Sequence, residues 1–160
     1  MTFRSVRTMV WWLLSSAAAQ AAGVVLTGVT NDCVAGKHSY PAGVSIYVFD
    51  PAKSPELDNV LKELAISPEP NPDDLAAVER FFAREERLLR LVKTSKRLAS
   101  TKSGAAGRFR VELPNAPDNL IVLGYAESVD GPANYASSQG KAATLSQASI
   151  VLDFTHGHCP

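Results

Sequence analysis

The stretch that decides the fold is T-K-S-G-A-A-G-R-F-R-V-E-L, residues 101–113. A glycine-containing turn runs directly into a strictly alternating segment, in which Phe109, Val111 and Leu113 would share one face of a strand. The charged residues between them would lie on the opposite face, as in an antiparallel sheet with one solvated side. The segment therefore predicts a small antiparallel β-sandwich rather than a helical protein or an enzyme of alternating strands and helices.

Four further segments have the composition of strands. They are rich in β-branched residues or alternate in polarity, and the connections between them contain proline, glycine and asparagine. The four segments are residues 23–30, 43–50, 119–126 and 148–154. The third is apolar on both faces, which is expected of a central strand. A shorter strand is also predicted within 141–145.

The segment 54–100 differs in composition from the strands around it. It is rich in charged residues, and a proline-containing break at 67–70 separates two helical patterns. The apolar positions of the second pattern are Leu75, Val78, Phe81, Phe82, Leu88, Leu89 and Val92. We therefore predict a helical hairpin with one apolar face. The face of the second predicted strand that carries Tyr47 and Phe49 is apolar and should be buried. We expect the hairpin to pack against this face.

The first 21 residues have the order of regions that is typical of a secretory signal peptide. Two arginines precede an apolar core, and Ala19-Gln20-Ala21 matches a cleavage site. A membrane anchor is disfavoured, because polar residues interrupt the apolar run before the roughly 20 residues that span a bilayer. We expect a mature chain of residues 22–160, secreted or periplasmic, which forms a single domain without stable membrane insertion.

Removal of residues 1–21 would change the charge balance of the chain, and export would favour pairing of its two cysteines. The mature chain would carry 14 basic and 16 acidic side chains, which gives no reason to expect a nucleic-acid partner. Cys33 follows the first predicted strand and Cys159 follows the last, in an oxidising compartment. We predict a Cys33–Cys159 disulfide. Closing a loop of about 126 residues would stabilise the fold by about 2–4 kcal/mol.

Four stretches carry a family resemblance. They are G-V-V-L-T-G-V-T (23–30), P-A-G-V-S-I-Y-V-F-D (41–50), the stretch 101–113 and N-L-I-V-L-G-Y (119–125). Together they resemble the carboxypeptidase regulatory-like, or transthyretin-like, domain, in which a short connection replaces the long insert found here. The resemblance implies a mainly β fold, an antiparallel prealbumin-like β-sandwich, here with a two-helix insertion that makes it α+β overall. It also implies an accessory, adhesive or ligand-binding role without catalytic residues.

The sequence contains no pattern that supports catalysis. Its histidines are His38, His156 and His158, and it has no nucleophile elbow, zinc-protease motif or phosphate loop. Neighbouring carboxylates such as Glu85 and Glu86 diverge by about 100° on a helix, so they cannot act together on one substrate. We predict a protein that is not an enzyme and has no cofactor.

Two groups of residues are candidates for binding. The first is a basic band on the second predicted helix, Arg80, Arg84, Arg87 and Arg90, continued by Arg97 and accompanied by Glu85. The arginines would meet an anionic glycan or lipid headgroup, or they form a solvated face paired with nearby glutamates. Glu85 falls within the apolar stripe, where it would contact the sheet or lean to the solvent edge.

The second group is the tail His156-Gly157-His158-Cys159. Two histidines and a thiolate would suit zinc or copper, with His38 as a further ligand. The alternative is a polar tail whose cysteine is held in the disulfide. Our leading prediction is an exported, non-catalytic binding or interaction module that recognises a protein or glycan partner through the insert 54–100. The alternative is a small periplasmic metal or small-ligand carrier that uses this tail.

Overall fold

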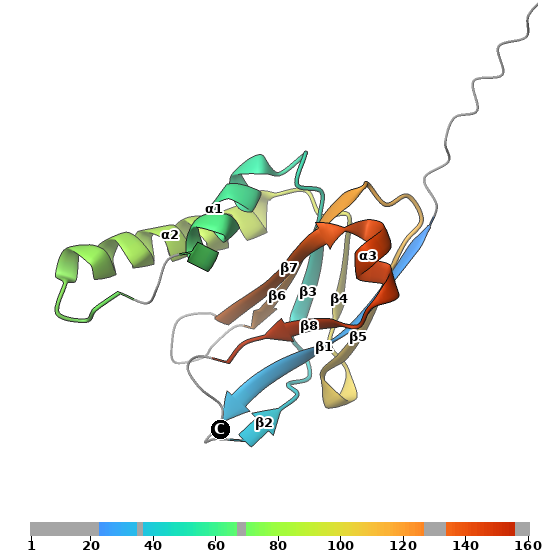
Figure 1. Ribbon diagram of the computed structural model, residues 1–160, viewed down its shortest axis with the longest axis horizontal. Coiled ribbons are helices and arrows are strands. Elements are labelled where there is room, and N and C mark those ends of the chain that lie inside the picture. The colour runs from blue at the N-terminus through green and yellow to red at the C-terminus, as the bar shows by residue number, and fades with distance from the viewer. Residues whose placement is uncertain (1–22, 35–36, 67–69, 127–133, 156–160) are drawn as a thin grey trace, which may run out of the picture.

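The computed structural model describes residues 23–34, 37–66, 70–126 and 134–155, which form two β-sheets and three α-helices (Figure 1). The strands are β1 (Val24–Val34), β2 (Lys37–Ser39), β3 (Ser45–Phe49), β4 (Ala99–Lys102), β5 (Arg108–Leu113), β6 (Asn119–Ala126), β7 (Asn134–Lys141) and β8 (Ile150–Asp153). The helices are α1 (Pro55–Ile66), α2 (Leu75–Thr94) and α3 (Ala142–Gln147), with a 3-10 turn at Ala105–Gly107. The signal segment 1–21 predicted above lies outside the described residues.

One sheet is built around β1. β5 pairs with β1 antiparallel, with Val24 opposite Leu113, and β2 folds back on the end of β1 as a hairpin. β8 pairs with β1 in parallel, with Gly28 opposite Ile150. This is the one parallel pairing among the described strands, and the other pairings are antiparallel, as predicted. Parallel neighbours need a long crossover connection, and because β1 and β8 are the first and last strands, the rest of the chain provides it.

The second sheet has the strand order β4-β3-β6-β7 and is antiparallel throughout. β6 lies between β3 and β7 and is buried on both faces, which confirms the central strand predicted for 119–126. The sequence patterns do not predict β4 or β7. β7 reads N-Y-A-S-S-Q-G-K, a polar segment that pairs with β6 from Asn119 opposite Lys141 to Ala126 opposite Asn134.

The predicted short strand within 141–145 is wrong, because these residues begin α3. The N–H of Ala142 donates to the carbonyl of Asp118 at 2.8 Å, which ties the start of α3 to the residue before β6. Ala142 is buried, and Leu145 packs against the same core. One turn of helix thus buries these two side chains while it carries the chain from β7 to β8.

The core between the two sheets follows the predicted alternation. In β5, Phe109, Val111 and Leu113 are buried and the charged residues between them are exposed. The other strands and the residues next to them contribute the buried residues Leu26, Val44, Ile46, Val48, Leu120, Val122, Ile150, Leu152 and Phe154. The Phe109 ring lies directly against Gly28, where a Cβ atom would come within 2.4 Å of the ring. Only glycine therefore allows β1 and this ring to approach so closely.

The helical hairpin covers the outer face of the second sheet, as predicted from the Tyr47 and Phe49 side of β3. Phe49 is fully buried there, and Tyr47 packs against the same cluster. The other buried members of this second core are Leu57, Val60, Leu61, Leu64, Leu88, Val92, Ile121 and Leu123. Four of them belong to α1 and only two to α2, so α1 is the helix that closes the sheet.

Candidate functional site

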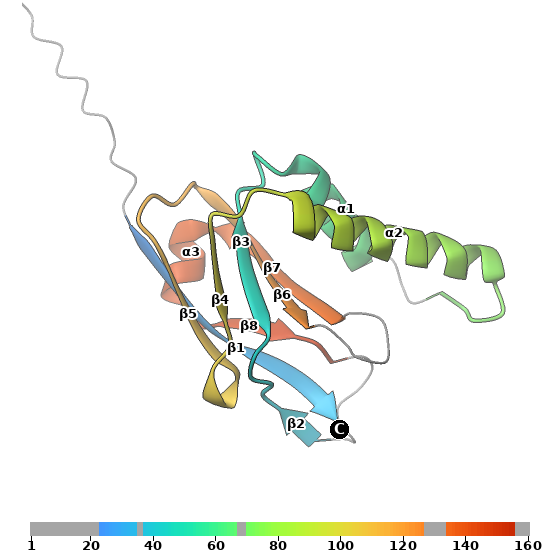
Figure 2. The ribbon, with the colours of Figure 1, turned by 180° about the vertical axis from the view of Figure 1, so that it is seen from behind.

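The helical hairpin does not lie flat on the sheet along its whole length. Both ribbon views show α2 extending well past the ends of the strands (Figures 1 and 2). The buried residues of α2 are Leu88 and Val92, and both lie in its C-terminal half. Asp74 begins the helix by accepting a hydrogen bond from the N–H of Ala77 at 3.0 Å. The N-terminal half of α2 is therefore a regular helix that projects from the sandwich without a buried residue of its own.

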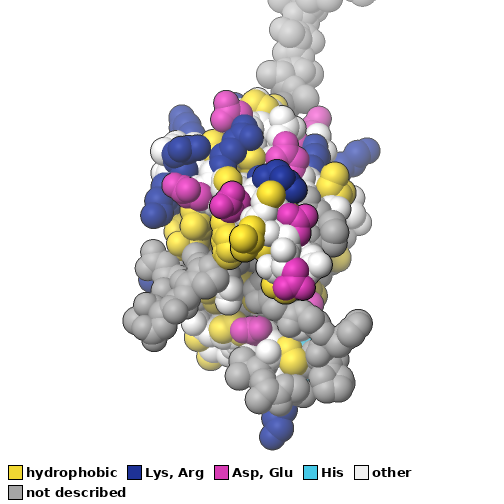
Figure 3. Space-filling model, turned by 90° about the vertical axis from the view of Figure 1, so that its left-hand side faces the viewer, with side chains coloured by type: hydrophobic (Ala, Val, Ile, Leu, Met, Phe, Trp, Pro, Cys, Tyr) yellow, Lys and Arg dark blue, Asp and Glu magenta, His cyan; other side chains and the backbone are white. Residues whose placement is uncertain are grey.

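Large apolar side chains with high exposure are concentrated on this hairpin. Ile66 at the end of α1 is 83% exposed, and Leu75 and Phe82 on α2 are 73% and 53% exposed. Seen from that end, apolar side chains lie among basic and acidic ones (Figure 3). Phe81 packs edge-on against Phe82, with ring centroids 6.1 Å apart, and also reaches the second core. Exposed apolar clusters of this kind are typical of interaction surfaces.

The apolar stripe predicted for α2 is therefore only partly right. Leu88 and Val92 are buried as expected, and Phe81 is half-buried. Leu75 and Phe82 instead face solvent, because this end of the helix extends beyond the sheet that would have covered them. Local periodicity cannot report where the sheet ends, since that depends on the strands.

The structure brings the four arginines of the basic band together. Successive helical residues turn by about 100°, so Arg80, Arg84, Arg87 and Arg90 fall within an arc of about 120°. Arg80 and Arg90 are exposed, and the other two are half-buried. The Nε–H of Arg84 donates to the carbonyl of Arg80 at 3.3 Å, which holds this side chain along the helix surface.

Arg97 does not belong to the basic band. Its guanidinium lies 3.9 Å from the ring centroid of Tyr47 and donates to the carbonyl of Val92 at 3.3 Å. This side chain therefore occupies one of the last carbonyls of α2 and stacks on the sheet below it. Its role is to hold the C-terminal end of α2 against β3.

Glu85 points away from the basic band and toward β7. It is half-buried, and its negative charge acts on Tyr135 of β7. Burial first, and then the negative charge of Glu85, raise the pKa of Tyr135 to about 12, while Arg84 acts in the opposite direction. The interpretation of Glu85 as a polar contact to the sheet is thus favoured. The sequence patterns miss Tyr135 because they do not predict β7.

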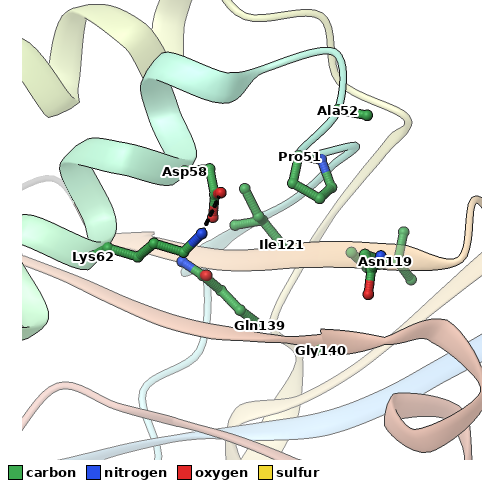
Figure 4. Close-up of a pocket in the computed structure, with 9 residues that line it drawn as sticks. Pro51, Ala52, Asp58, Lys62, Asn119, Ile121, Gln139 and Gly140 are labelled. Atoms are coloured by element: carbon green, nitrogen blue, oxygen red, sulfur yellow. Dashed lines mark hydrogen bonds and ion pairs between the residues drawn. The ribbon is translucent and has the colours of Figure 1, made fainter.

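A hollow of about 500 Å³ lies between α1 and the ends of β6 and β7 (Figure 4). It is lined by Pro51, Ala52, Asp58, Lys62, Asn119, Leu120, Ile121, Gln139 and Gly140. Lys62 already donates to Asp58 at 2.6 Å, so the two charges at its edge satisfy each other. The amides of Asn119 and Gln139 remain as groups for a small polar ligand. The hollow is open, and polar and apolar groups line it in similar measure, unlike the mostly apolar pockets that bind small molecules tightly.

The C-terminal candidates His156, His158 and Cys159 lie outside the described residues, so neither the metal site nor the disulfide is tested. Among the described residues, the side chains of His38, Asn31 and Asp153 form a connected chain of polar contacts. His38 Nδ1 lies 3.1 Å from Asn31 Oδ1, and Asn31 Nδ2 donates to Asp153 Oδ1 at 3.0 Å. Among the residues with described positions, no three His, Cys, Asp or Glu side chains gather as metal ligands.

The fold is mainly β, with two packed sheets and a helical hairpin inserted between β3 and β4. Comparison with protein-family models and with curated proteins finds no match to the chain. The resemblance to the carboxypeptidase regulatory-like domain therefore stays a prediction from the four stretches that carry it. In the described ranges, no helix has the length and apolar run that crossing a membrane requires.

Proposed function

We propose that the chain is an exported, non-catalytic interaction module of the carboxypeptidase regulatory-like type, which binds a protein partner through the projecting half of α2. The observation that carries this proposal is the exposure of Leu75 and Phe82 on a part of the helix that contributes no buried residue. Covering two such side chains with a partner would remove apolar surface from water and favour association.

The rest of the molecule fits the role of a frame for this helix. The two sheets bury their facing sides against each other, and α1 closes the outer side of the second sheet. Arg97 holds the C-terminal end of α2 against Tyr47, so the projecting end is presented from a fixed base. A rigid base lowers the entropy that a partner must overcome when it binds the helix.

Deletion of the insert 54–100 is not a clean test of this proposal. α1 lies within that segment, and its removal would expose Phe49, Ile121 and Leu123, which are fully buried beneath the hairpin. The deletion would unfold or aggregate the sandwich for a reason unrelated to binding. Surface substitutions on the projecting half of α2 leave this second core intact.

The test is a Leu75→Ser/Phe82→Ser variant of the exported protein, used as bait in its native extracellular or periplasmic extract. The matched control is Val151→Ser, which removes another apolar side chain of similar exposure, 56%, from β8. We expect a protein partner that the wild type and the control enrich equally and the double variant does not. Equal enrichment by all three baits would contradict the proposal, and circular dichroism would verify that each variant is folded.

A further inference from the structure

The second exposed surface of α2 is a stripe without acidic residues. Arg80, Arg87 and Arg90 lie on it, and the positions between them are Ala76, Ala83 and Thr94. With about 100° per residue, these six positions fall within an arc of about 80°. Five of them are exposed and Arg87 is half-buried. The stripe presents three guanidinium groups over about 15 Å of helix, separated only by small side chains.

These arginines lack the ion pairs that other basic residues make. Lys53, Lys62 and Arg110 each pair with a carboxylate. Within the described part of the chain, no ion pair is formed by Arg80, Arg87 or Arg90, although Glu86 stands four residues before Arg90. The predicted solvated face of paired charges is therefore not what the helix shows at these positions.

Unpaired like charges on one stripe repel each other and can bind an anion. Arg87 and Arg90 are three residues apart, a spacing at which equal charges destabilise a helix slightly. A bound anion would remove this repulsion, and planar guanidinium groups suit the oxygens of carboxylate or sulfate because they can donate two parallel hydrogen bonds. The chain as a whole has no positive excess, so the stripe is a local feature and not a consequence of net charge.

We propose that this stripe binds an acidic polysaccharide, a linear glycan with repeated carboxylate or sulfate groups. A linear polyanion can contact all three arginines at once along the helix. A flat bilayer fits less well, because the apolar side chains of Leu75 and Phe82 lie about 110° around the helix from the centre of the stripe. The stripe is thus a surface separate from the apolar one that we assign to a protein partner.

The experiment measures binding of the mature chain to heparin, a sulfated glycan, and to alginate, a carboxylated one, with neutral dextran as the reference. We expect saturable binding to at least one of the acidic glycans and none to dextran. The affinity should fall steeply as salt is raised, because the charges are solvent-exposed. The thermal midpoint of unfolding should rise when the glycan is present.

The decisive variant is Arg80→Gln/Arg87→Gln/Arg90→Gln, which we expect to bind about tenfold more weakly or not at all. The matched control, Lys102→Gln/Arg108→Gln/Lys141→Gln, removes the same charge from exposed positions on the sandwich and should bind like the wild type. Equal losses in both variants would overturn the proposal in favour of unspecific attraction. Unchanged binding by the decisive variant, or no binding of the wild type, would also overturn it.

Vesicles of phosphatidylglycerol and phosphatidylcholine test a lipid surface as the alternative partner of the stripe. We expect no binding to vesicles that requires both the arginine stripe and the apolar side chains of Leu75 and Phe82. Vesicle binding lost in the arginine variant and in Leu75→Ser/Phe82→Ser, together with no binding to either glycan, would replace the polysaccharide by a membrane. Because the apolar variant keeps all three arginines, its glycan binding should match the wild type even where it loses a protein partner.

Discussion

At the scale of single residues, burial and the negative charge of Glu85 raise the pKa of Tyr135. Tyr135 lies on β7 opposite Tyr125 of β6, and Glu85 lies in the middle of α2. Burial and a nearby negative charge both oppose the loss of the phenolic proton. Tyr135 also packs against the second core, so this edge of the second sheet meets the hairpin through apolar packing as well as through the charge of Glu85.

The raised pKa of Tyr135 predicts how stability depends on alkaline pH. An unfolded tyrosine loses its proton near pH 10, whereas the folded state holds this proton to about pH 12. The stabilising contribution is therefore complete below pH 10 and is lost as the pH rises toward 12. Tyrosinate absorbance should show a late step with a midpoint near pH 12, and Tyr135→Phe should remove that step.

Charge variants of the neighbours test the cause of this shift. Glu85→Gln should lower the pKa of Tyr135 because it removes a negative charge, and Arg84→Gln should raise it further because it removes a positive one. Opposite shifts in these two variants support the arrangement of α2 over β7. A titration in which both variants match the wild type would show that Glu85 does not face the sheet.

At the scale of elements, the two helices of the hairpin have different roles. α1 is short and buries one full face, whereas α2 is longer and buries only its C-terminal half. The N-terminal half of α2 is held by its own hydrogen bonds and by the Asp74 cap rather than by the sandwich. The hairpin thus combines a part that packs on the sandwich with a part that is exposed to solvent.

This division predicts unequal costs for truncating leucines in the two helices. Leu61 of α1 is 3% exposed, so Leu61→Ala should lower the free energy of unfolding by about 2–5 kcal/mol. Leu75 of α2 is 73% exposed, so Leu75→Ala should change it by less than about 0.5 kcal/mol. Urea unfolding followed by circular dichroism measures both, and similar costs for the two variants would refute the division.

At the scale of the whole molecule, the parallel pairing of β1 with β8 places the last described strand beside the first one. Asn31 lies opposite Asp153, two residues before Cys33. The six residues from Asp153 to Cys159 can span up to about 20 Å, so the chain is long enough for the predicted disulfide. Such a bond would close the sandwich at its first and last strands.

The disulfide prediction is checked on the full-length protein, expressed in a host with an export pathway and purified without reductant. We expect a chain that begins near Ala22 and whose intact mass is two hydrogens below that of the reduced chain. This chain should take up no alkylating agent before reduction. Cys33→Ser should lower the free energy of unfolding by about 2–4 kcal/mol. Two thiols alkylated in the native protein, or a bound metal lost with His156→Ala/His158→Ala, would instead support the alternative carrier function.

What could be predicted from the sequence was the part that depends on short-range pattern. The alternation of 107–113 predicts the buried face of β5, and the apolar run 119–126 predicts a central strand. The break at 67–70 and the apolar spacing on either side predict two helices that cover Tyr47 and Phe49. Each of these features follows from burial on one or both faces of a local element, which leaves a period in the residues themselves.

The tertiary structure alone decided the features that depend on a neighbour distant in the chain. β7 is a polar segment that becomes a strand by pairing with β6, and β8 lies parallel to β1 because the intervening chain crosses over. Leu75 and Phe82 have the spacing of a core stripe, yet they are exposed because α2 extends beyond the sheet beneath it. The sequence thus determined which residues form α1, α2 and most strands, whereas the candidate site arose from where those elements end relative to one another.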